Sequence, residues 1–180
     1  MYGPAVILQL VVFCAIACCK NVARKSPTNY VMLGIFTICW TYILTFICTF
    51  YYDQKEDVFL AALFTAAITV TISVYACFTE TDYTVLCGPF LCWGLLMVLC
   101  VQMMLSLLTG LFYYSTGMFF PFCAGFCVIL YALYILVDTQ LIVGGGRHEL
   151  SIDDYIIGAM ILYIDIIMLF LELLRLFGRN

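Results

Sequence analysis

The sequence predicts an all-α integral membrane protein with about six transmembrane helices, which form a single polytopic domain over residues 1–180. Hydrophobic residues make up 66% of the 180 residues and charged residues only 10%, and the mean hydropathy is +1.14. A soluble domain has roughly 45 to 50% apolar residues, so this chain is far too apolar to fold in water. No polar tract in the sequence is long enough to form a separate soluble domain.

Six apolar stretches approach the roughly 20 residues that a helix needs to cross the hydrocarbon core of a bilayer. They occupy residues 4–19, 30–51, 58–78, 85–108, 117–137 and 155–176. The first stretch is short, but no basic residue precedes it as in a signal peptide, so we expect a short transmembrane span there. The polar breaks between the stretches read KNVARKSPTN, YDQKED, TETD, YYST and GGGRHELSIDD.

The basic residues Lys20, Arg24 and Lys25 predict that the first break is cytosolic, because short loops rich in Lys and Arg stay on that side. Arg24 is interpreted first as a member of this cytosolic charge cluster. Alternation then places TETD and GGGRHELSIDD on the cytosolic side and YDQKED on the other side. Alternating spans carry the C-terminus to the outside, whereas a re-entrant last helix would leave it cytosolic.

The connection before the last span contains signals for the end of one helix and the start of the next. Glycines at 144–146 favour a stop, and Ser151 with Asp154 resembles a capping box. Asp153 and Asp154 also lie where the positive end of a helix dipole favours acids. We therefore expect the last helix to begin directly after Asp154.

Two aspartates lie within the predicted apolar hairpin at matching depth. At 1.5 Å per residue, Asp138 lies about 9 Å before Gly144, and Asp165 lies about 15 Å beyond Tyr155 in the next span. An aspartate at the centre of a span costs roughly 2.5 to 3.5 kcal/mol, so two at one level are not expected to face lipid. We predict that the two carboxyl groups face each other or a watery cavity.

Other polar residues fall on the same faces of these two helices. Gly158, Asp165 and Glu172 are spaced by seven residues, which places them on one stripe of the last helix. Tyr131 and Tyr134 lie on the same side of the preceding helix as its aspartate. The sequence therefore predicts a polar interior between the last two helices, with Glu172 and Tyr134 in supporting positions.

Paired carboxyl groups in a low dielectric share one proton and titrate as a unit, which makes them a pH-dependent latch. With the proton, the helices are tied together. With both Asp138 and Asp165 ionised, they repel, and the gap opens or accepts a hard cation such as Ca²⁺ through oxygen ligands. The alternative is that each aspartate separately hydrogen-bonds a tyrosine or serine and only holds helices together.

Three stretches of the chain carry a specific sequence pattern. They are SPTNYVMLGIFT, VDTQLIVGG and ELSIDDYIIGAMILYIDIIMLFLELLRLFG, at residues 26–37, 137–145 and 149–178. Together they resemble the transmembrane Bax-inhibitor-motif proteins, most closely the lifeguard branch. The shared pattern is an Asp-Thr-Gln-Leu segment, a Gly-Gly turn, a Ser-x-x-Asp-Tyr helix start and a Leu-Tyr-x-Asp-Ile-Ile core. The resemblance is strongest in the last third of the chain and continues more loosely through the rest.

This resemblance implies a seven-helix fold with a central last helix, in the endoplasmic reticulum or Golgi membrane. It implies calcium leak from intracellular stores and suppression of cell death. The pH-sensing aspartates of the family fall on Asp138 and Asp165, and an arginine that contacts them in bacterial relatives falls near Arg24. The alignment starts inside the second helix of the family, so we expect the first helix and the N-terminal cytosolic segment to be missing.

The leading hypothesis is therefore a pH-sensitive calcium leak channel or leak-type transporter that suppresses cell death, gated by the two aspartates, with Ca²⁺ as the transported ion and no cofactor. One alternative is a non-conducting membrane protein that regulates cell death or another channel through helix contacts. Another is an intramembrane aspartyl protease, but neither aspartate lies in a Gly-x-Gly-Asp sequence, so we expect no enzyme. The chain has no basic patch for nucleic acid, and its 11 cysteines lie mostly in apolar runs, where a thiol behaves as a small hydrophobe.

Overall fold

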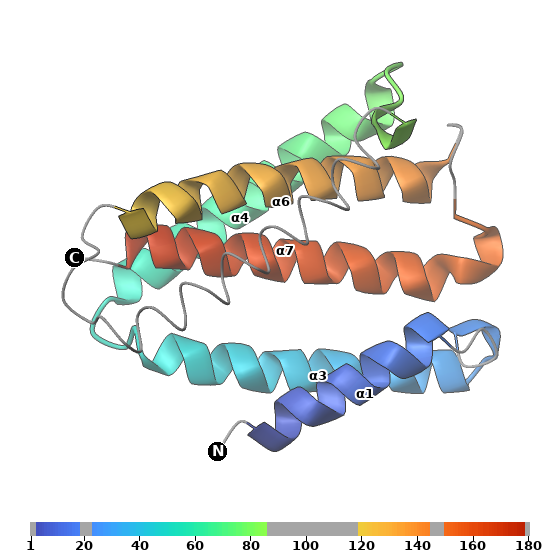
Figure 1. Ribbon diagram of the computed structural model, residues 1–180, viewed down its shortest axis with the longest axis horizontal. Coiled ribbons are helices and arrows are strands. Elements are labelled where there is room, and N and C mark those ends of the chain that lie inside the picture. Colours follow the sequence, from blue (N-terminus) through green and yellow to red (C-terminus); the bar gives the residue numbers. More distant parts are fainter. Residues whose placement is uncertain (1–2, 19–22, 86–118, 145–149, 179–180) are drawn as a thin grey trace.

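A computed structural model describes residues 3–18, 23–85, 119–144 and 150–178 of the protein, and within these ranges the regular structure is helical (Figure 1). The elements are α1 (Gly3–Cys18), α3 (Thr28–Thr49), α4 (Lys55–Phe78), α6 (Phe119–Val143), the short 3-10 helix η1 (Ile152–Asp154) and α7 (Tyr155–Phe177). Among the described residues, α3, α4, α6 and α7 are long and apolar enough to cross a membrane. The predicted all-α membrane fold is confirmed.

Most of the predicted spans match observed helices closely, with one correction. The predicted spans at 30–51, 58–78 and 155–176 are α3, α4 and α7, and the predicted short first span is the 16-residue α1. The span predicted to end at residue 137 is α6, which continues to Val143, so Asp138 lies inside the helix. A charge that faces another helix does not end its own helix. The predicted span at 85–108 falls almost entirely outside the described residues.

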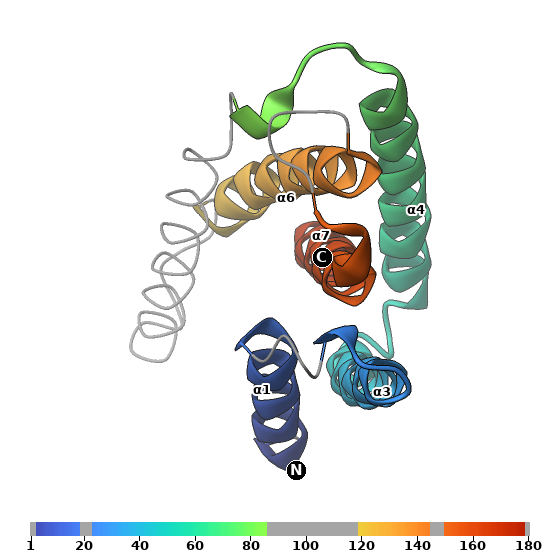
Figure 2. The same cartoon turned by 90° about the vertical axis from the view of Figure 1, so that its right-hand side faces the viewer.

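Helix α7 lies at the centre of the assembly, as predicted. Figure 2 looks roughly along α3, α6 and α7 and shows α7 with α6, α4, α3 and α1 arranged around it. In α7, 44% of the most apolar window is buried, against 11% of the corresponding window in α4. The outer helices leave much of their apolar surface for lipid, whereas α7 buries the largest share of its window among the four long helices.

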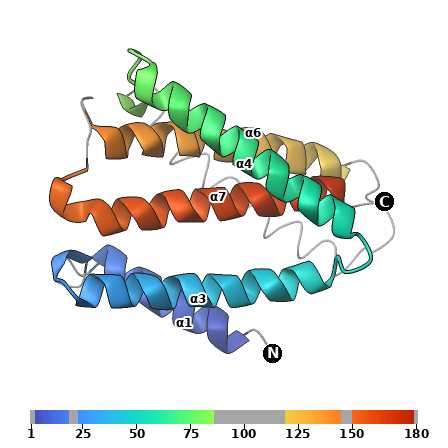
Figure 3. The same ribbon diagram turned by 180° about the vertical axis from the view of Figure 1, so that it is seen from behind.

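Successive helix ends alternate between the two ends of the molecule, as the predicted topology requires. The start of α3, the ends of α4 and α6, and the start of α7 lie at one end of the molecule (Figures 1 and 3). The turn from α3 to α4 and the end of α7 lie at the other end. Because Arg24 lies in the connection just before α3, we call the first of these the Arg24 end.

The connection between α6 and α7 contains the predicted stop and start signals. Gly144 follows the last residue of α6 with φ at 77°, and its N–H donates to the Gln140 carbonyl at 3.0 Å, which is a left-handed helix cap. The other two glycines of the predicted stop lie outside the described residues. Ser151 Oγ accepts a hydrogen bond from the Asp153 N–H, and α7 starts at Tyr155 as predicted. The predicted capping box needs a correction, because the Asp154 side chain binds Arg24 instead of capping α7.

Helices α6 and α7 run antiparallel (Figure 1), and Gly158 of α7 meets Ile142 of α6 near the Arg24 end. Gly158 on α7 is buried at this contact. A Cβ at this position would lie 3.1 Å from Ile142 Cγ1 and 3.5 Å from Leu150 Cδ1. The missing side chain therefore lets the two backbones approach, as small residues commonly do between membrane helices.

Replacing Gly158 by leucine should lower the free energy of unfolding by about 1 to 3 kcal/mol, because the new side chain must displace Ile142. Thermal unfolding in detergent measures this change. The matched control is Gly34→Leu on α3, where an added Cβ meets nothing within 4 Å. Equal losses in the two variants would contradict a specific role for close packing at Gly158.

Candidate functional site

The structure brings Asp138 of α6 and Asp165 of α7 together, as their matching depth predicted. The side chains of this aspartate pair lie within hydrogen-bonding reach of each other. Asp165 is 8% exposed and Asp138 is half-buried. A hydrogen bond between two carboxyl groups needs a proton on one of them, so the pair is built to hold one proton between α6 and α7.

The surroundings of Asp165 offer little compensation for a second negative charge. Its Oδ2 atom is buried and receives no hydrogen bond from the N–H and O–H donors of the described residues. A buried carboxylate without donors is costly, whereas a carboxyl group that shares a proton is neutral in part. The geometry thus favours the predicted shared proton over separate hydrogen bonds from each aspartate to a tyrosine or serine.

The predicted stripe of Gly158, Asp165 and Glu172 faces the interior, since all three residues are buried. Because α6 and α7 are antiparallel, Tyr131, seven residues before Asp138, lies at the level of Glu172. Tyr131 is 4% exposed and interacts electrostatically with both Glu172 and Asp165. The α6–α7 seam therefore has a second polar layer, about 10 Å from the aspartate pair at 1.5 Å per residue.

Tyr134, which the sequence placed in a supporting position, lies one turn from the aspartate pair on α6. Its ring centroid is 6.0 Å from that of Tyr131, and it is partly buried against the hydrophobic cluster formed by α4, α6 and α7. The two tyrosine rings thus pack near each other beside the polar stripe of α7.

Glu172 is paired with Arg175, one turn further along α7. The Arg175 Nη1 atom donates to both carboxylate oxygens, at 3.1 and 3.2 Å. The Glu172 side chain is 3% exposed and that of Arg175 is 45% exposed, so the guanidinium reaches water while the carboxylate stays inside. Sequence reasoning missed Arg175, although a basic residue three positions after an acid near a helix C-terminus is a recognisable signal.

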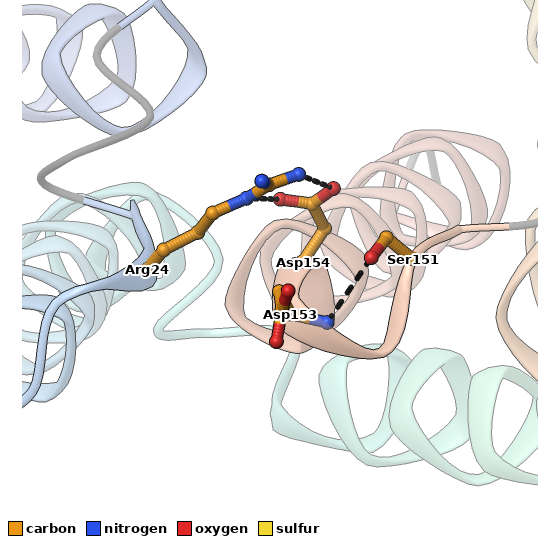
Figure 4. A network of polar contacts seen from close by, with 4 residues as sticks. All are labelled: Arg24, Ser151, Asp153 and Asp154. Carbon is orange, nitrogen blue, oxygen red and sulfur yellow. Dashed lines mark hydrogen bonds and ion pairs between the residues drawn. The ribbon is translucent and has the colours of Figure 1, made fainter.

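Arg24 does not contact the aspartate pair, which corrects the supporting role that the family resemblance assigned to it. Its Nε and Nη2 atoms donate to the two carboxylate oxygens of Asp154, each at 2.7 Å (Figure 4). The physical reason is distance: Arg24 lies in the turn before α3, whereas Asp165 lies about 15 Å inside α7 at 1.5 Å per residue. The hydrogen bonds and the charge of Asp154 raise the pKa of the Arg24 guanidinium above its ordinary value.

A chain of hydrogen bonds beside this ion pair also joins α3 to α7. The fully buried Asn29 donates through Nδ2 to the Tyr155 hydroxyl at 2.9 Å, and that hydroxyl donates to the Tyr30 hydroxyl at 3.1 Å. We call Arg24, Asn29, Tyr30, Asp154 and Tyr155 the α3–α7 clasp. Sequence reasoning missed this connection, since the partners lie more than 120 residues apart.

The described residues contain no group of three or more His, Cys, Asp or Glu side chains that could hold a metal ion. Within these ranges the aspartate pair therefore consists of two carboxyl groups with no third acid beside them. A polar cavity of about 210 Å³ lies between the end of α4 and the end of α6, with Glu80, Asp82, Thr84 and Gln140 in its lining. This cavity opens at the Arg24 end.

Breaking the clasp should loosen the start of α7. We expect Arg24→Gln to increase hydrogen exchange of the backbone amides after Asp154, and Arg24→Lys to do so less, because an ammonium group cannot pair in the bidentate geometry. The charge swap Arg24→Asp with Asp154→Arg should restore most of the protection. Because its raised pKa keeps Arg24 charged throughout the physiological pH range, the protection should be equal at pH 6 and pH 8 after correction for intrinsic rates.

The control for this experiment is Lys25→Gln, which removes an exposed positive charge from the neighbouring residue. If this control loosens α7 as much as Arg24→Gln, the loss of any positive charge in this turn is enough to cause the effect. The clasp would then have no specific role.

Comparison with known proteins identifies the family. The family model described as "Inhibitor of apoptosis-promoting Bax1" matches residues 1–180. The chain is 28% identical to Protein lifeguard 3 of Mus musculus over 180 residues and 29% identical to that of Homo sapiens over 181 residues; both matches cover 100% of this chain and 57% of the relative. It is 31% identical to Protein LIFEGUARD 4 of Arabidopsis thaliana over 175 residues, which cover 96% of this chain and 65% of that protein.

The chain thus spans somewhat more than half the length of the lifeguard 3 proteins that it matches. No solved structure gives a significant match. None of the three relatives is named for an enzymatic activity. With a family model that covers every residue and apolar helices long enough to cross a bilayer, this chain belongs to the Bax-inhibitor family of integral membrane proteins.

Proposed function

We propose that this protein forms a pH-sensitive calcium leak pathway in an endomembrane, in the endoplasmic reticulum or Golgi, and that it suppresses cell death by this route. The observation that carries the proposal is the direct contact between the Asp138 and Asp165 carboxyl groups, on α6 and on the central helix α7. A titratable contact between two packed helices is a gate in which one proton decides whether the helices attract or repel each other.

The gate works through the change in electrostatic energy between the two protonation states. With a shared proton, a hydrogen bond ties α6 to α7. With both groups ionised, two like charges about 4 Å apart repel by roughly 4 kcal/mol at an effective dielectric constant of about 20. That energy is comparable to the packing of a few side chains, so it is large enough to separate a single pair of helices without unfolding the protein.

Calcium suits this gate as a transported ion. Carboxylate oxygens are the ligands that Ca²⁺ prefers, and a resident site normally supplies six to eight oxygen atoms. Two carboxylates contribute only a fraction of such a shell, and water supplies the rest, so the ion is held briefly and passes on. The acids that line the cavity at the Arg24 end raise the local concentration of cations beside α6.

The proposed role in cell death rests on the family to which the chain belongs. Its family model is described as an inhibitor of apoptosis-promoting Bax1, and the leak supplies a physical route to that effect. A controlled leak lowers the amount of calcium that a store can release during stress. The aspartate pair sets the pH at which this leak is active.

Calcium efflux from liposomes that contain the purified chain tests the gate. Leak should be faster at pH 8 than at pH 6, because higher pH ionises the pair. Asp138→Asn and Asp165→Asn should each bring the ratio of the two rates close to one, since neither variant retains two ionisable groups. The control Asp53→Asn removes an exposed acid from the turn before α4 and should keep the pH dependence of the unchanged protein.

A pH profile that survives both aspartate substitutions would refute the proposed gate. The absence of leak from folded protein at either pH would refute calcium conduction and favour a non-conducting protein that acts through helix contacts.

The role in cell death has a separate readout. In cells stressed by release of stored calcium, expression of the chain should raise survival, and Asp165→Asn should remove this protection together with the pH-dependent leak. Protection that persists in the Asp165→Asn variant would separate survival from the gate.

A further inference from the structure

The seam between α6 and α7 carries a second buried acid that the proposed gate does not use. Glu172 lies on the same stripe of α7 as Asp165, seven residues further along, and is 2% exposed. It is therefore about 10 Å from the aspartate pair at 1.5 Å per residue. The space between the two acids is filled by protein and not by solvent, since Leu169 and Leu173 beside them are 0% and 3% exposed.

The charges of Glu172 and its partner do not cancel at the aspartate pair. The Arg175 side chain is 45% exposed, so water and salt screen much of its positive charge. The Glu172 carboxylate is buried, on the side of α7 that faces the pair, so its field reaches the pair through a medium of low dielectric constant. The pair therefore experiences a net negative potential from this ion pair.

Among the described residues, the other side chains that pack at the seam add little to this field. The seam is contacted by Cys127, Tyr131 and Tyr134 of α6, and by Cys48 and Tyr51 from the end of α3 and the turn after it. These residue types are uncharged at neutral pH. From α4 the cluster takes apolar residues, and the buried polar residue of α4, Thr65, is uncharged as well. The charged first turn of α4 carries Lys55, Glu56 and Asp57, none of which is buried, so solvent screens them.

We propose that Glu172 is a positioning residue for the gate, whose buried negative charge raises the pH at which the aspartate pair gives up its shared proton. Arg175 holds Glu172 ionised, and the geometry of the seam directs its field at Asp165. The physiological meaning rests on the proposed leak function, but the electrostatic coupling between the acids does not. It can therefore be measured in the protein whether or not the chain conducts.

The test is a titration of the aspartate pair in the reconstituted chain by infrared spectroscopy. The protonated-carboxyl band that disappears in Asp165→Asn reports the pair. Glu172→Gln should move the midpoint of this band to lower pH by about 1 pH unit, from one unit charge about 10 Å away at an effective dielectric constant of about 20. The pH midpoint of calcium efflux should move by the same amount in the same direction.

Three variants make the result specific. Glu172→Met removes the same charge with an apolar side chain of similar volume, and it should give the same shift, so the test does not depend on how glutamine is accommodated. The double variant Glu172→Gln with Arg175→Gln should also keep the shift, because Arg175 is screened. The control Asp53→Asn removes an exposed acid at the same end of the molecule and should leave the midpoint unchanged.

An unchanged midpoint in both Glu172→Gln and Glu172→Met would overturn the proposal. If the shift vanishes in the double variant, it was caused by the positive charge of Arg175 after that residue lost its partner. This result would also overturn the proposal. A band that shifts as expected in a chain without leak would uphold the coupling and refute the proposed function. A normal leak together with an unshifted band would refute the coupling and support the proposed function.

Discussion

A carboxyl group in the hydrocarbon core of a bilayer is costly unless it is paired, and α7 carries Asp165 and Glu172 on one face. That face cannot be exposed to lipid, so α7 must be enclosed by other helices, and this accounts for its central place. Asp138 then determines which helix lies against Asp165 and in which register, because any other register of α6 would leave both aspartates without a partner. Gly158 permits the close approach that the pairing needs at the Arg24 end.

Polar contacts decide this arrangement because the apolar residues cannot. Between membrane helices no hydrophobic force distinguishes a leucine that faces lipid from one that faces protein, so association depends on packing, small residues and hydrogen bonds. In α7 these contacts are distributed along the whole helix. The clasp binds its start to α3, the aspartate pair binds its middle to α6, and the pairing of Glu172 with Arg175 satisfies a buried carboxylate near its end.

The same distinction explains what could be predicted from the sequence. Hydropathy predicted α3, α4 and α7 to within a few residues, because span length is set by the bilayer. Depth alone predicted that Asp138 and Asp165 meet. The apolar stretch that predicted α6 stopped at residue 137, short of the end of the helix at Val143, because hydropathy does not count polar residues such as Asp138 and Gln140 that continue the helix. The partner of Arg24 could not be predicted, because which acid it meets depends on how two connections fold at one end of the molecule, and no periodicity encodes that geometry.

The two long-range polar contacts of α7 respond differently to pH, and this determines which helix we expect to move. The clasp joins α7 to α3 through Arg24, whose raised pKa keeps it charged throughout the physiological range. The aspartate pair joins α7 to α6 and is the contact that gains repulsion as protons leave. The apolar cluster formed by α1, α3 and α7 reinforces the first connection. Opening of the pair should therefore loosen α6 against α7 at the level of the two aspartates, while the clasp keeps the start of α7 on α3.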